Sequence, residues 1–464
     1  EALVVAPARP AASQARPPAP PAPPTPPAPP APPAPPAPPA PPRSGLLSWL
    51  SGGHQGEWHS VWSKDGRKID VRARGEVVLT DDDSDIKSLS PGGYLTIAER
   101  SGLFGGVTFE ARSVNGKIER KWSGLNGDAE RRKWLADHLL ELVRTSGLAA
   151  DSRVARILKK SGPDGVLQEI SRITSDYVKR MYFRRLIDAT SLDGATLSRL
   201  IAQAGREMRS AYDLASVLTN LAPRLKDDST RLAYLQAVGS IGSDYERRRT
   251  LGALMKAGNL SPAVVAALVD AAKAIRSDYD IASVLIELLR ASDIIDANRE
   301  AFAAAVDTIQ SDYERRRVLT TLADRGTPTP AVLKAIYTSA SRMRSSYDLA
   351  EVLVDCLRRH PLDATLRPAF FAAVGKLTSD YERRRVLSVL ADDSRIDNDT
   401  LIALLQATAE IRSGYERATV LSSIAEQHRL QGAARDAYLA AARSVSSRYD
   451  QDRALAALTR AEMK

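Results

Sequence analysis

The sequence predicts a mainly α protein: a right-handed α-solenoid of about nine 34-residue two-helix repeats, preceded by a small antiparallel β-domain and a polyproline II stalk. Three observations lead to this fold class: a proline-rich N-terminal stretch, a region of alternating apolar and polar residues, and a tyrosine motif with regular spacing. The expected domains are a stalk or linker (1–44), the β-domain (45–125), a helical N-terminal cap (126–174) and the solenoid (175–464).

The N-terminal stretch is low in complexity. From Pro17 to Pro42 it repeats a Pro-Pro-Ala triplet, with Thr25 as the one substitution. Proline fixes φ and has no backbone N–H, so this sequence favours a polyproline II rod that extends roughly 80 Å. We interpret the segment as a stalk or spacer. The alternative is a docking site for a module that reads PxxP motifs.

Alternation with a period of two begins near Glu57 and ends near Ser123, and it predicts half-buried strands. We expect an antiparallel sheet of five or six strands. Turn signals separate the strands at Lys64-Asp65-Gly66, Pro91-Gly92-Gly93, Gly105-Gly106 and Asn115-Gly116. The aromatic residues expected in its core or on its faces are Trp58, Trp62, Tyr94, Phe109 and Trp122.

Few residues suggest a metal or a reactive group, and no cofactor is expected. The acidic run from Asp81 to Asp85 lacks the glycine and the terminal glutamate of an EF-hand loop, so we interpret it as a solvated turn. The spacing of His54 and His59 fits no zinc motif. Cys356 lies in an apolar helical run and is expected to be a buried small hydrophobe.

Helical spacing begins at Asp128, where an amphipathic pattern runs to about Gly147. Shorter helices are expected at 153–160 and 164–173. This region is less regular than the sequence that follows, so we interpret it as the cap that covers the apolar end of the array.

A tyrosine motif then recurs nine times, with spacings of 35, 33 and six times 34, at Tyr177, Tyr212, Tyr245, Tyr279, Tyr313, Tyr347, Tyr381, Tyr415 and Tyr449. A serine two residues before each tyrosine and an acidic residue one after it form a capping box in most units, as in Ser311 and Glu314. The second helix of a unit begins at sites such as Ser261-Pro262 and Thr329-Pro330.

The units alternate, which gives an effective repeat of 68 residues and predicts two kinds of interface. Every second unit carries three arginines after its tyrosine and acidic residue; these candidate partner-binding residues are Arg247, Arg248, Arg249, Arg315, Arg316, Arg317, Arg383, Arg384 and Arg385. They suit an acidic partner. The alternative is ion pairing within the array: Asp312 with Arg316, Glu314 with Arg317, and Asp280 or Asp348 with an arginine of the neighbouring repeat.

The nine tyrosines also have two interpretations. They could form a stacking ladder for single-stranded nucleic acid. A tyrosine in the first turn of a helix more often packs on the preceding unit, while its hydroxyl reaches a partner. We favour this second role.

The stretch from Asp85 to Leu95, together with the Ser-Asp-Tyr-Glu repeats, resembles a group of uncharacterised bacterial envelope proteins. In that group, similar β-domains and repeats occur alone or beside membrane-bound sensor or BlaR-like peptidase parts. The resemblance covers roughly residues 57–464 and implies no activity. The helical hairpins are also similar to tetratricopeptide repeats. However, the Trp, Leu-Gly, Tyr, Ala and Pro positions of those repeats are not matched, so we expect a HEAT-like or generic α-solenoid.

The expected function is that of a non-enzymatic protein-interaction scaffold of the bacterial envelope, periplasmic, cell-surface or secreted. No HExxH, P-loop, GxSxG or paired-cysteine motif is present in the sequence. A net charge of +9 arises from 65 basic and 56 acidic residues, so nucleic-acid binding is not expected. The alternatives are a self-assembling filament or lattice and a binder of acidic polymer or peptide. A membrane contact would require an anchor upstream of Glu1.

Overall fold

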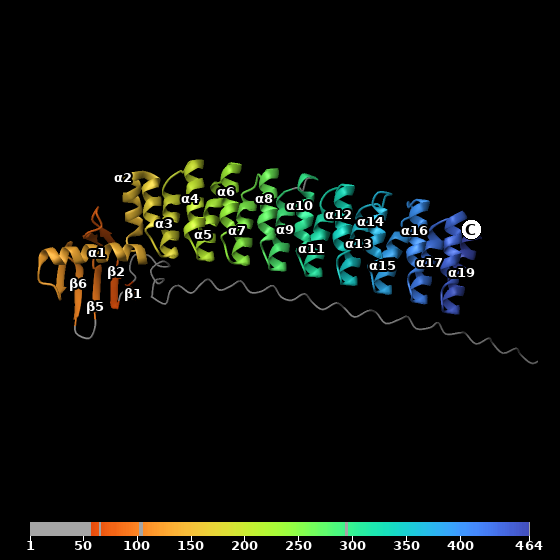
Figure 1. The fold of residues 1–464 in the computed structure, drawn as a ribbon, viewed down its shortest axis with the longest axis horizontal. Helices are drawn as coiled ribbons and strands as arrows, with labels where there is room; N and C mark the ends of the chain where they lie inside the picture. Colours follow the sequence, from red (N-terminus) through yellow and green to blue (C-terminus); the bar gives the residue numbers. More distant parts are fainter. Residues whose placement is uncertain (1–56, 65, 102–104, 293–295, 464) are drawn as a thin grey trace, which may run out of the picture. The chain divides into compact units, whose positions relative to one another are not determined.

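The computed structural model describes residues 57–463 except 65, 102–104 and 293–295. Every described residue belongs to one unit of the chain. The predicted stalk and His54 lie outside the described residues. In the described part, a small antiparallel sheet precedes a series of helices, which confirms the predicted fold class (Figure 1).

The predicted antiparallel sheet of five or six strands is confirmed. The described residues form seven strands: β1 (Glu57–Lys64), β2 (Arg67–Arg74), β3 (Val77–Leu79), β4 (Ile86–Leu89), β5 (Tyr94–Ser101), β6 (Gly105–Val114) and β7 (Lys117–Ser123). Five of them form an antiparallel sheet in the order β1-β2-β5-β6-β7, and β3 pairs with β4 in a separate hairpin. Strand β4 has four residues, which are too few for alternation to be recognised.

Alternation places one face of each central strand in the core. Val71 of β2, Leu95 of β5 and Phe109 of β6 are fully buried. Asn115 and Gly116 form the predicted two-residue hairpin between β6 and β7, and both have positive φ, as a type I′ turn requires.

The predicted turn at Gly105-Gly106 is wrong, because both glycines lie within β6. A Cβ atom at Gly106 would lie 2.9 Å from the carbonyl oxygen of Glu99 on the paired strand. Glycine is therefore needed here for close packing of two strands rather than for a turn.

Helix α1 (Asp128–Ser146) covers the buried face of the sheet and ends at Gly147 in the left-handed conformation. Its buried residues Leu135, Leu139 and Val143 belong to the same hydrophobic core as Phe109. The sequence-based division placed this helix in the cap of the array, whereas its packing makes it part of the core of the β-domain.

Helix α2 (Ala150–Ser171) begins the core of the array. It is broken at Gly162, whose φ of 64° and ψ of −169° are accessible to glycine alone, and Pro163 starts the second half. The two short helices predicted here are therefore confirmed.

The helices that follow alternate between two layers. The odd helices are α3 (Asp176–Ala189), α5 (Ala211–Leu221), α7 (Asp244–Lys256), α9 (Asp278–Ala291), α11 (Asp312–Asp324), α13 (Ser346–Arg359), α15 (Asp380–Ala391), α17 (Gly414–Gln427) and α19 (Arg448–Glu462). The even helices are α4 (Gly194–Glu207), α6 (Asp228–Val238), α8 (Pro262–Lys273), α10 (Asp296–Asp307), α12 (Pro330–Ala340), α14 (Arg367–Val374), α16 (Asn398–Ala409) and α18 (Gly432–Arg443). A short 3₁₀ helix, η1 (Ala222–Arg224), follows α5.

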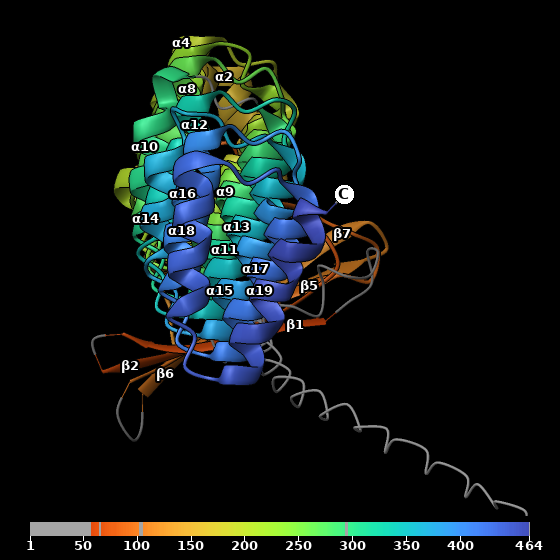
Figure 2. The same cartoon turned by 90° about the vertical axis from the view of Figure 1, so that its right-hand side faces the viewer.

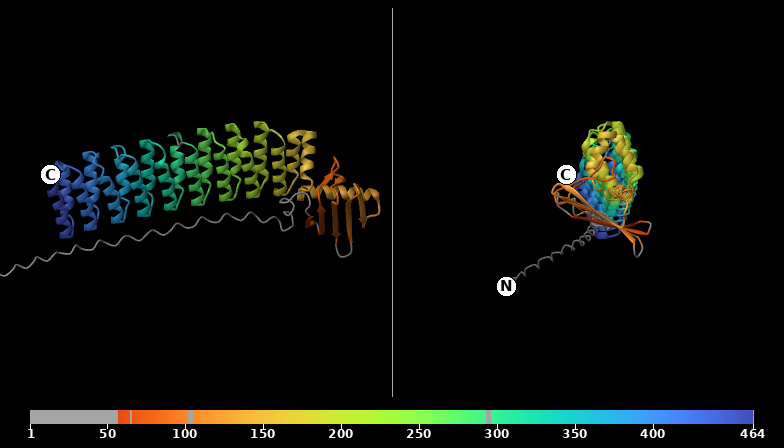
Figure 3. Two further views of the ribbon diagram at one scale, coloured as in Figure 1. Left: turned by 180° about the vertical axis from the view of Figure 1, so that it is seen from behind. Right: turned by 90° about the vertical axis from the view of Figure 1, so that its left-hand side faces the viewer.

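Each odd helix packs on the next odd helix, and each even helix on the next even helix. Seen along the array, the two layers lie on opposite sides (Figure 2), and the units follow one another in chain order (Figure 3). This confirms the predicted succession of two-helix repeats. Each unit buries its apolar stripe against its neighbours, as in other solenoids.

The predicted N-caps are present. The serine before each motif tyrosine accepts a hydrogen bond from the backbone N–H three residues later, from Ser175 to Ser447. Ser261 and Thr329 cap α8 and α12, with a proline at the first helical position. The strongest sequence signal of the protein therefore determines where each odd helix begins.

The core of the array is mostly aliphatic. Cys356 is fully buried in α13, and burial raises the pKa of its thiol to about 12, so the thiol is held in its neutral form. Its predicted role as a buried small residue is confirmed.

Candidate interaction surface

The nine motif tyrosines line the N-terminal ends of the odd helices, and we call them the tyrosine row. They are half-buried from Tyr177 to Tyr381, and Tyr415 and Tyr449 are 40% and 62% exposed. The tyrosines that the core does bury completely are others, such as Tyr234 and Tyr438. The predicted core role is therefore wrong in part, because the second helical position lies at the surface of its layer.

The motif hydroxyls do not reach the partner that we expected. In the part of the chain that the structure describes, no motif tyrosine has a hydrogen bond to its hydroxyl oxygen, whereas the hydroxyl of buried Tyr234 donates to the carbonyl oxygen of Thr250 at 2.8 Å. The tyrosine row thus presents aromatic rings with free polar tips.

In the first two triplets, the second arginine lies between two tyrosines of successive repeats, whereas Arg384 of the third triplet lies over the ring of Tyr381 and pairs with Glu416. The guanidinium carbon of Arg248 is 5.4 Å from the ring centroid of Tyr245 and 5.5 Å from that of Tyr279. Its Nε also lies 2.7 Å from a carboxylate oxygen of Asp280. Arg316 repeats the arrangement, with the rings of Tyr313 and Tyr347 and the carboxylate of Asp348. Each such arginine joins two repeats by an ion pair and two cation–π contacts.

The third arginine of each triplet points back to the preceding repeat. Arg385 donates to Glu351 of α13 at 2.6 Å, and Arg249 lies over the ring of Tyr212 of α5 at 5.7 Å. Within its own helix, each third arginine pairs with the acidic residue three positions earlier, such as Glu314 with Arg317. The predicted Glu314–Arg317 pair is therefore confirmed.

The first arginine of each triplet binds backbone carbonyl groups at the ends of even helices. Arg383 donates to the carbonyl oxygen of Leu377, just after α14, at 2.8 Å. It also donates to the carbonyl oxygen of Glu410, at the end of α16, at 3.1 Å. Arg247 donates to Ala274 at the end of α8 at 2.6 Å, and Arg315, which is almost fully buried, donates to Ile309. These arginines satisfy carbonyl groups that a helix end leaves without partners.

The structure therefore places all nine candidate arginines in contacts within the array. The predicted bonds to Asp280 and Asp348 are present. The expected pair between Asp312 and Arg316 is replaced by another contact: Asp312 accepts hydrogen bonds from the backbone N–H groups of Arg344 (2.9 Å) and Ser345 (2.8 Å) in the next repeat. The carboxylate lies at the start of α11 and faces the start of α13 instead of its own helix.

This contact between repeats recurs and was not predicted. We call the aspartates that make it the staple aspartates: Asp176, Asp244, Asp278, Asp312 and Asp380. Each staple aspartate accepts a hydrogen bond from the backbone N–H of the next N-cap serine. In a complete capping box, the acidic residue three positions after that serine would accept this bond. Here that acidic residue pairs with an arginine instead. An aspartate directly after a capping serine, in five units that are 68, 34, 34 and 68 residues apart, is the signal that could have identified it.

The predicted alternation with a period of 68 residues is confirmed by these contacts. Helices α3, α7, α11 and α15 provide an arginine to the acidic residue of the next odd helix. Arg453 of α19 lies over the ring of Tyr415 and reaches Thr419, both on α17. Helices α5, α9 and α13 therefore contact an arginine of the preceding odd helix and an arginine of the following odd helix.

A buried ionic cluster joins the β-domain to the array. Asp83, in the acidic run, accepts a hydrogen bond from Nε of Arg153 at 2.7 Å and also forms an ion pair with Arg156. Arg153 is 3% exposed and binds Glu169 at 2.9 Å and the Tyr182 hydroxyl at 3.0 Å. The prediction of a solvated turn thus fails at Asp83, whose positive φ turns its side chain to this cluster.

The β-domain contains a second buried polar cluster. Glu99, 8% exposed, accepts a hydrogen bond from Trp134 Nε1 at 2.9 Å and lies 2.9 Å from His138 Nε2. Burial acts to raise the pKa of Glu99, but the Trp134 bond and the charges of His138 and Arg67 outweigh it and lower that pKa. His59 lies apart from this cluster and pairs with Asp70 at the surface.

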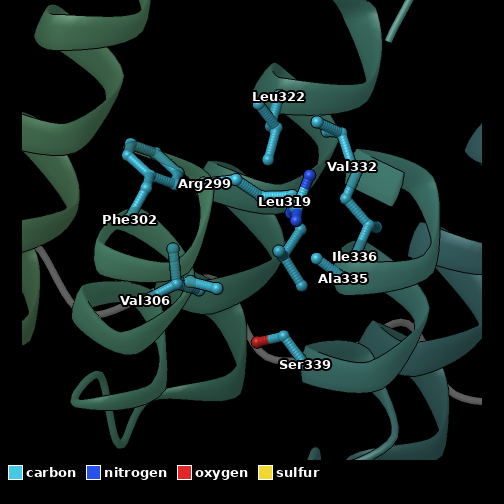
Figure 4. Close-up of a pocket in the computed structure, with 10 residues that line it drawn as sticks. Arg299, Phe302, Val306, Leu319, Leu322, Val332, Ala335, Ile336 and Ser339 are labelled. Carbon is cyan, nitrogen blue, oxygen red and sulfur yellow. The ribbon is translucent and has the colours of Figure 1, made fainter. Parts of the chain in front are cut away.

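A small cavity lies between α10, α11 and α12, and its walls are mostly apolar (Figure 4). Its volume of about 20 Å³ has room for about one water molecule. Small-molecule sites are an order of magnitude larger, so this cavity is a packing defect rather than a substrate pocket.

The outward surface of α18 and α19 is polar where inner repeats are apolar. Leu401, Ala418 and Ala425 are buried against the neighbouring repeat. The residues 34 positions later, Arg435, Asp452 and Thr459, are exposed polar residues. This surface therefore lacks the apolar area on which a further repeat, or another copy, would stack.

Within the described ranges, no three His, Cys, Asp or Glu residues are grouped in a way that could hold a metal ion. None of the described helices combines the length and apolar character that a membrane span requires. A scan against models of known protein families and a search of curated proteins found no match. The argument about function therefore depends on the surface itself.

Proposed function

We propose that the chain is a non-enzymatic protein-interaction scaffold of the bacterial cell envelope, which a Pro-rich stalk presents to a protein or peptide partner. The observation that supports this function most directly is the tyrosine row. It offers one part-exposed aromatic ring per repeat along a stack of odd helices, and among the described residues its hydroxyls have no hydrogen-bond partner, although that of Tyr177 is buried. Tyrosine is enriched at protein interfaces because it provides a large apolar area together with a polar tip.

Two other functions receive less support. Binding of an acidic polymer would use the arginine triplets, but these already bind carboxylates or backbone carbonyl groups, so a polymer would have to displace existing ion pairs. Assembly by stacking of repeat ends would bury the exposed Asp452 and the Arg435–Glu462 ion pair, which costs desolvation. A lateral contact with a partner protein requires neither change.

Site-specific photo-crosslinking tests the proposal. A photoreactive phenylalanine replaces Tyr415 or Tyr449 in the row, and a control replaces Leu232, which is 40% exposed on the even helix α6. We expect a discrete crosslinked partner in an envelope extract from the row positions and none from position 232. Equal crosslinking from all three positions, or turnover of a substrate by the purified protein without a partner, would refute the scaffold function.

A further inference from the structure

At three of its eight intervals, the tyrosine row has a step that is bounded by an arginine lying over both rings. Because the guanidinium of Arg248 lies 5.4 Å and 5.5 Å from two successive ring centroids, those centroids are at most about 11 Å apart. Packed helices lie about 8–10 Å apart, so eight steps give a row of roughly 60–80 Å. A partner that follows the row must therefore repeat every 8–10 Å or so.

Charges along the row are paired. Arg316 lies 3.1 Å from Asp348, Arg317 pairs with Glu314, and Asp312 is held by two backbone N–H groups of the next repeat. A charged partner would have to compete with these pairs and pay for their desolvation. The row therefore favours an uncharged partner.

The hydrogen-bonding groups of the row also indicate a type of partner. The tyrosine hydroxyls that have no hydrogen-bond partner among the described residues can donate a hydrogen bond. A polyproline II segment supplies the complement, because its backbone carbonyl groups have no bonds within the segment and its prolines carry no N–H group. Aromatic surfaces are the usual docking sites for such segments.

The repeat of a polyproline II helix matches the step of the row. With three residues per turn and about 3.1 Å per residue, one turn advances roughly 9 Å. The sequence from Pro17 to Pro42 contains nine Pro-Pro pairs, each separated from the next by one alanine or by Thr25, and it carries no charge. Its extended length of roughly 80 Å equals the upper estimate for the row.

We propose that the tyrosine row of one molecule binds the Pro-Pro-Ala segment, residues 17–42, of a second copy of this chain, with one triplet on each repeat. The proposal rests on the function above and specifies its partner. The polar outward surface of α18 and α19 is consistent with it, because association through a side surface does not need apolar repeat ends. A segment in which proline restricts φ loses little conformational entropy on binding.

The first test uses two labelled synthetic peptides and the full chain. One peptide has the sequence of residues 17–42, and the other has the same length with a Pro-Pro-Ala-Ala unit, which keeps the composition similar but changes the period. We expect fluorescence anisotropy to show at least about tenfold weaker binding of the four-residue repeat, because most of its prolines fall out of step with the rings. Equal binding of both peptides, or binding of neither, would overturn the proposal.

The second test locates the site. Tyr415→Ala with Tyr449→Ala, at the more exposed end, and Tyr279→Ala with Tyr313→Ala, in the middle, should each weaken binding of the 17–42 peptide several-fold. Leu232→Ala on the even layer is the matched control and should leave binding unchanged. Circular dichroism melting confirms that each variant is folded. Unchanged binding by both tyrosine pairs would show that the row is not the site.

The third test identifies the source of the segment. Sedimentation of the full chain should show association that rises with concentration and disappears when residues 17–42 are replaced by a Gly-Ser linker of equal length. A strict monomer that binds the peptide only after this replacement would mean that the segment comes from the same molecule, and the second copy would be refuted. If no peptide binds but an envelope protein still crosslinks to Tyr449, this inference fails and the scaffold function stands.

Discussion

The junction between the β-domain and the array and the junctions between repeats both pair arginine with carboxylates, but they differ in depth. Arg153 is 3% exposed, and its partners Asp83 and Glu169 are 8% and 4% exposed. At the repeat junctions, the side chains of Arg248 and Arg316 are 29% and 19% exposed and lie against tyrosine rings. The same type of ion pair therefore occurs in two environments. At the β-domain junction it is buried and occurs once, and at the repeat junctions it is partly exposed to solvent and recurs.

This difference determines what each junction contributes. In the dry cluster, every charge depends on its partner, because an unpaired buried ion costs several kcal/mol. In the repeat junctions, water partly replaces a lost partner, and the aromatic contacts add a modest amount. We conclude that the first junction depends on one set of buried ion pairs, whereas the second provides many small increments along the array.

The largest effect is expected from Arg153→Met. This change leaves Asp83 and Glu169 buried with less compensation and should cost about 3–5 kcal/mol. Denaturation followed by tryptophan fluorescence, which reports on the β-domain, measures it. The matched control is Arg199→Met, because Arg199 pairs with Asp164 at an exposed site and its loss should change stability by less than about 0.5 kcal/mol. Equal effects of the two changes would show that depth does not distinguish the junctions.

A smaller loss is expected from Asp312→Ala. This substitution removes a staple aspartate and leaves the backbone N–H groups of Arg344 and Ser345 without their acceptor. By analogy with the loss of a helix N-cap, the cost should be about 1–2 kcal/mol. Hydrogen exchange of the first turn of α13 should accelerate, while exchange in α5 should not. Unchanged exchange in α13 would mean that solvent satisfies these groups equally well.

The sequence was sufficient to predict the repeats because the strongest signals in it are local. Ser311 and Glu314 mark a helix start through contacts within three residues, and Asn115-Gly116 marks a hairpin through its own φ angles. Their prediction needed no knowledge of tertiary structure.

The contacts between units could not be predicted in the same way. Asp312 has possible partners on its own helix, and only the packing of α11 on α13 shows that it binds the next repeat. Asp83 lies in a run of four aspartates, and the sequence does not show which of them meets Arg153, 70 residues later. The burial of each contact determines its energy, and burial depends on how the helices pack in the folded protein.

Glu169 at the first junction and Glu382 at one repeat junction should respond to acid with opposite signs. Burial acts to raise the pKa of Glu169, but hydrogen bonds and charges from Arg144 and Arg153 outweigh it and lower that pKa below 4.5. Its contribution is therefore complete above pH 4.5 and is lost as the pH falls through the folded value. For Glu382 of α15, burial raises the pKa above 4.5 despite Arg385, so acidification from neutral pH through the folded value should stabilise that repeat.

Two conservative variants test this difference in sign. At neutral pH, Glu169→Gln should destabilise the protein by about 1–3 kcal/mol, because an arginine loses its charged partner. Glu382→Gln should be neutral or slightly stabilising. Stability of both variants and the parent is measured between neutral pH and about pH 4. A loss from Glu382→Gln as large as that from Glu169→Gln would contradict the assigned environments.

One repeat offers a test by gain of stability. Ala211 stands at the position of a staple aspartate in α5, and its neighbours in the next repeat are Gly242 and Ser243. Ala211→Asp should supply the missing acceptor and stabilise the protein by about 0.5–1 kcal/mol. Thermal melting measures the gain. Ala211→Asn, with a side-chain oxygen but no charge, is the comparison and should gain less, because a carboxylate at a helix start also interacts with the macrodipole.

The smallest effect is expected where an arginine is replaced by another cation. Arg316→Lys keeps the charge near Asp348 but removes the planar group that lies 5.1 Å and 5.4 Å from the rings of Tyr313 and Tyr347. Lysine stacks less well and binds a carboxylate through a single point, so the loss should be about 0.5–1 kcal/mol. A double-mutant cycle with Tyr347→Leu isolates the aromatic part, and the exposed Arg344→Lys is the control. If the cycle shows no coupling, the rings of the row contribute nothing to holding the repeats together, and their regular exposure is more readily explained by binding than by stability.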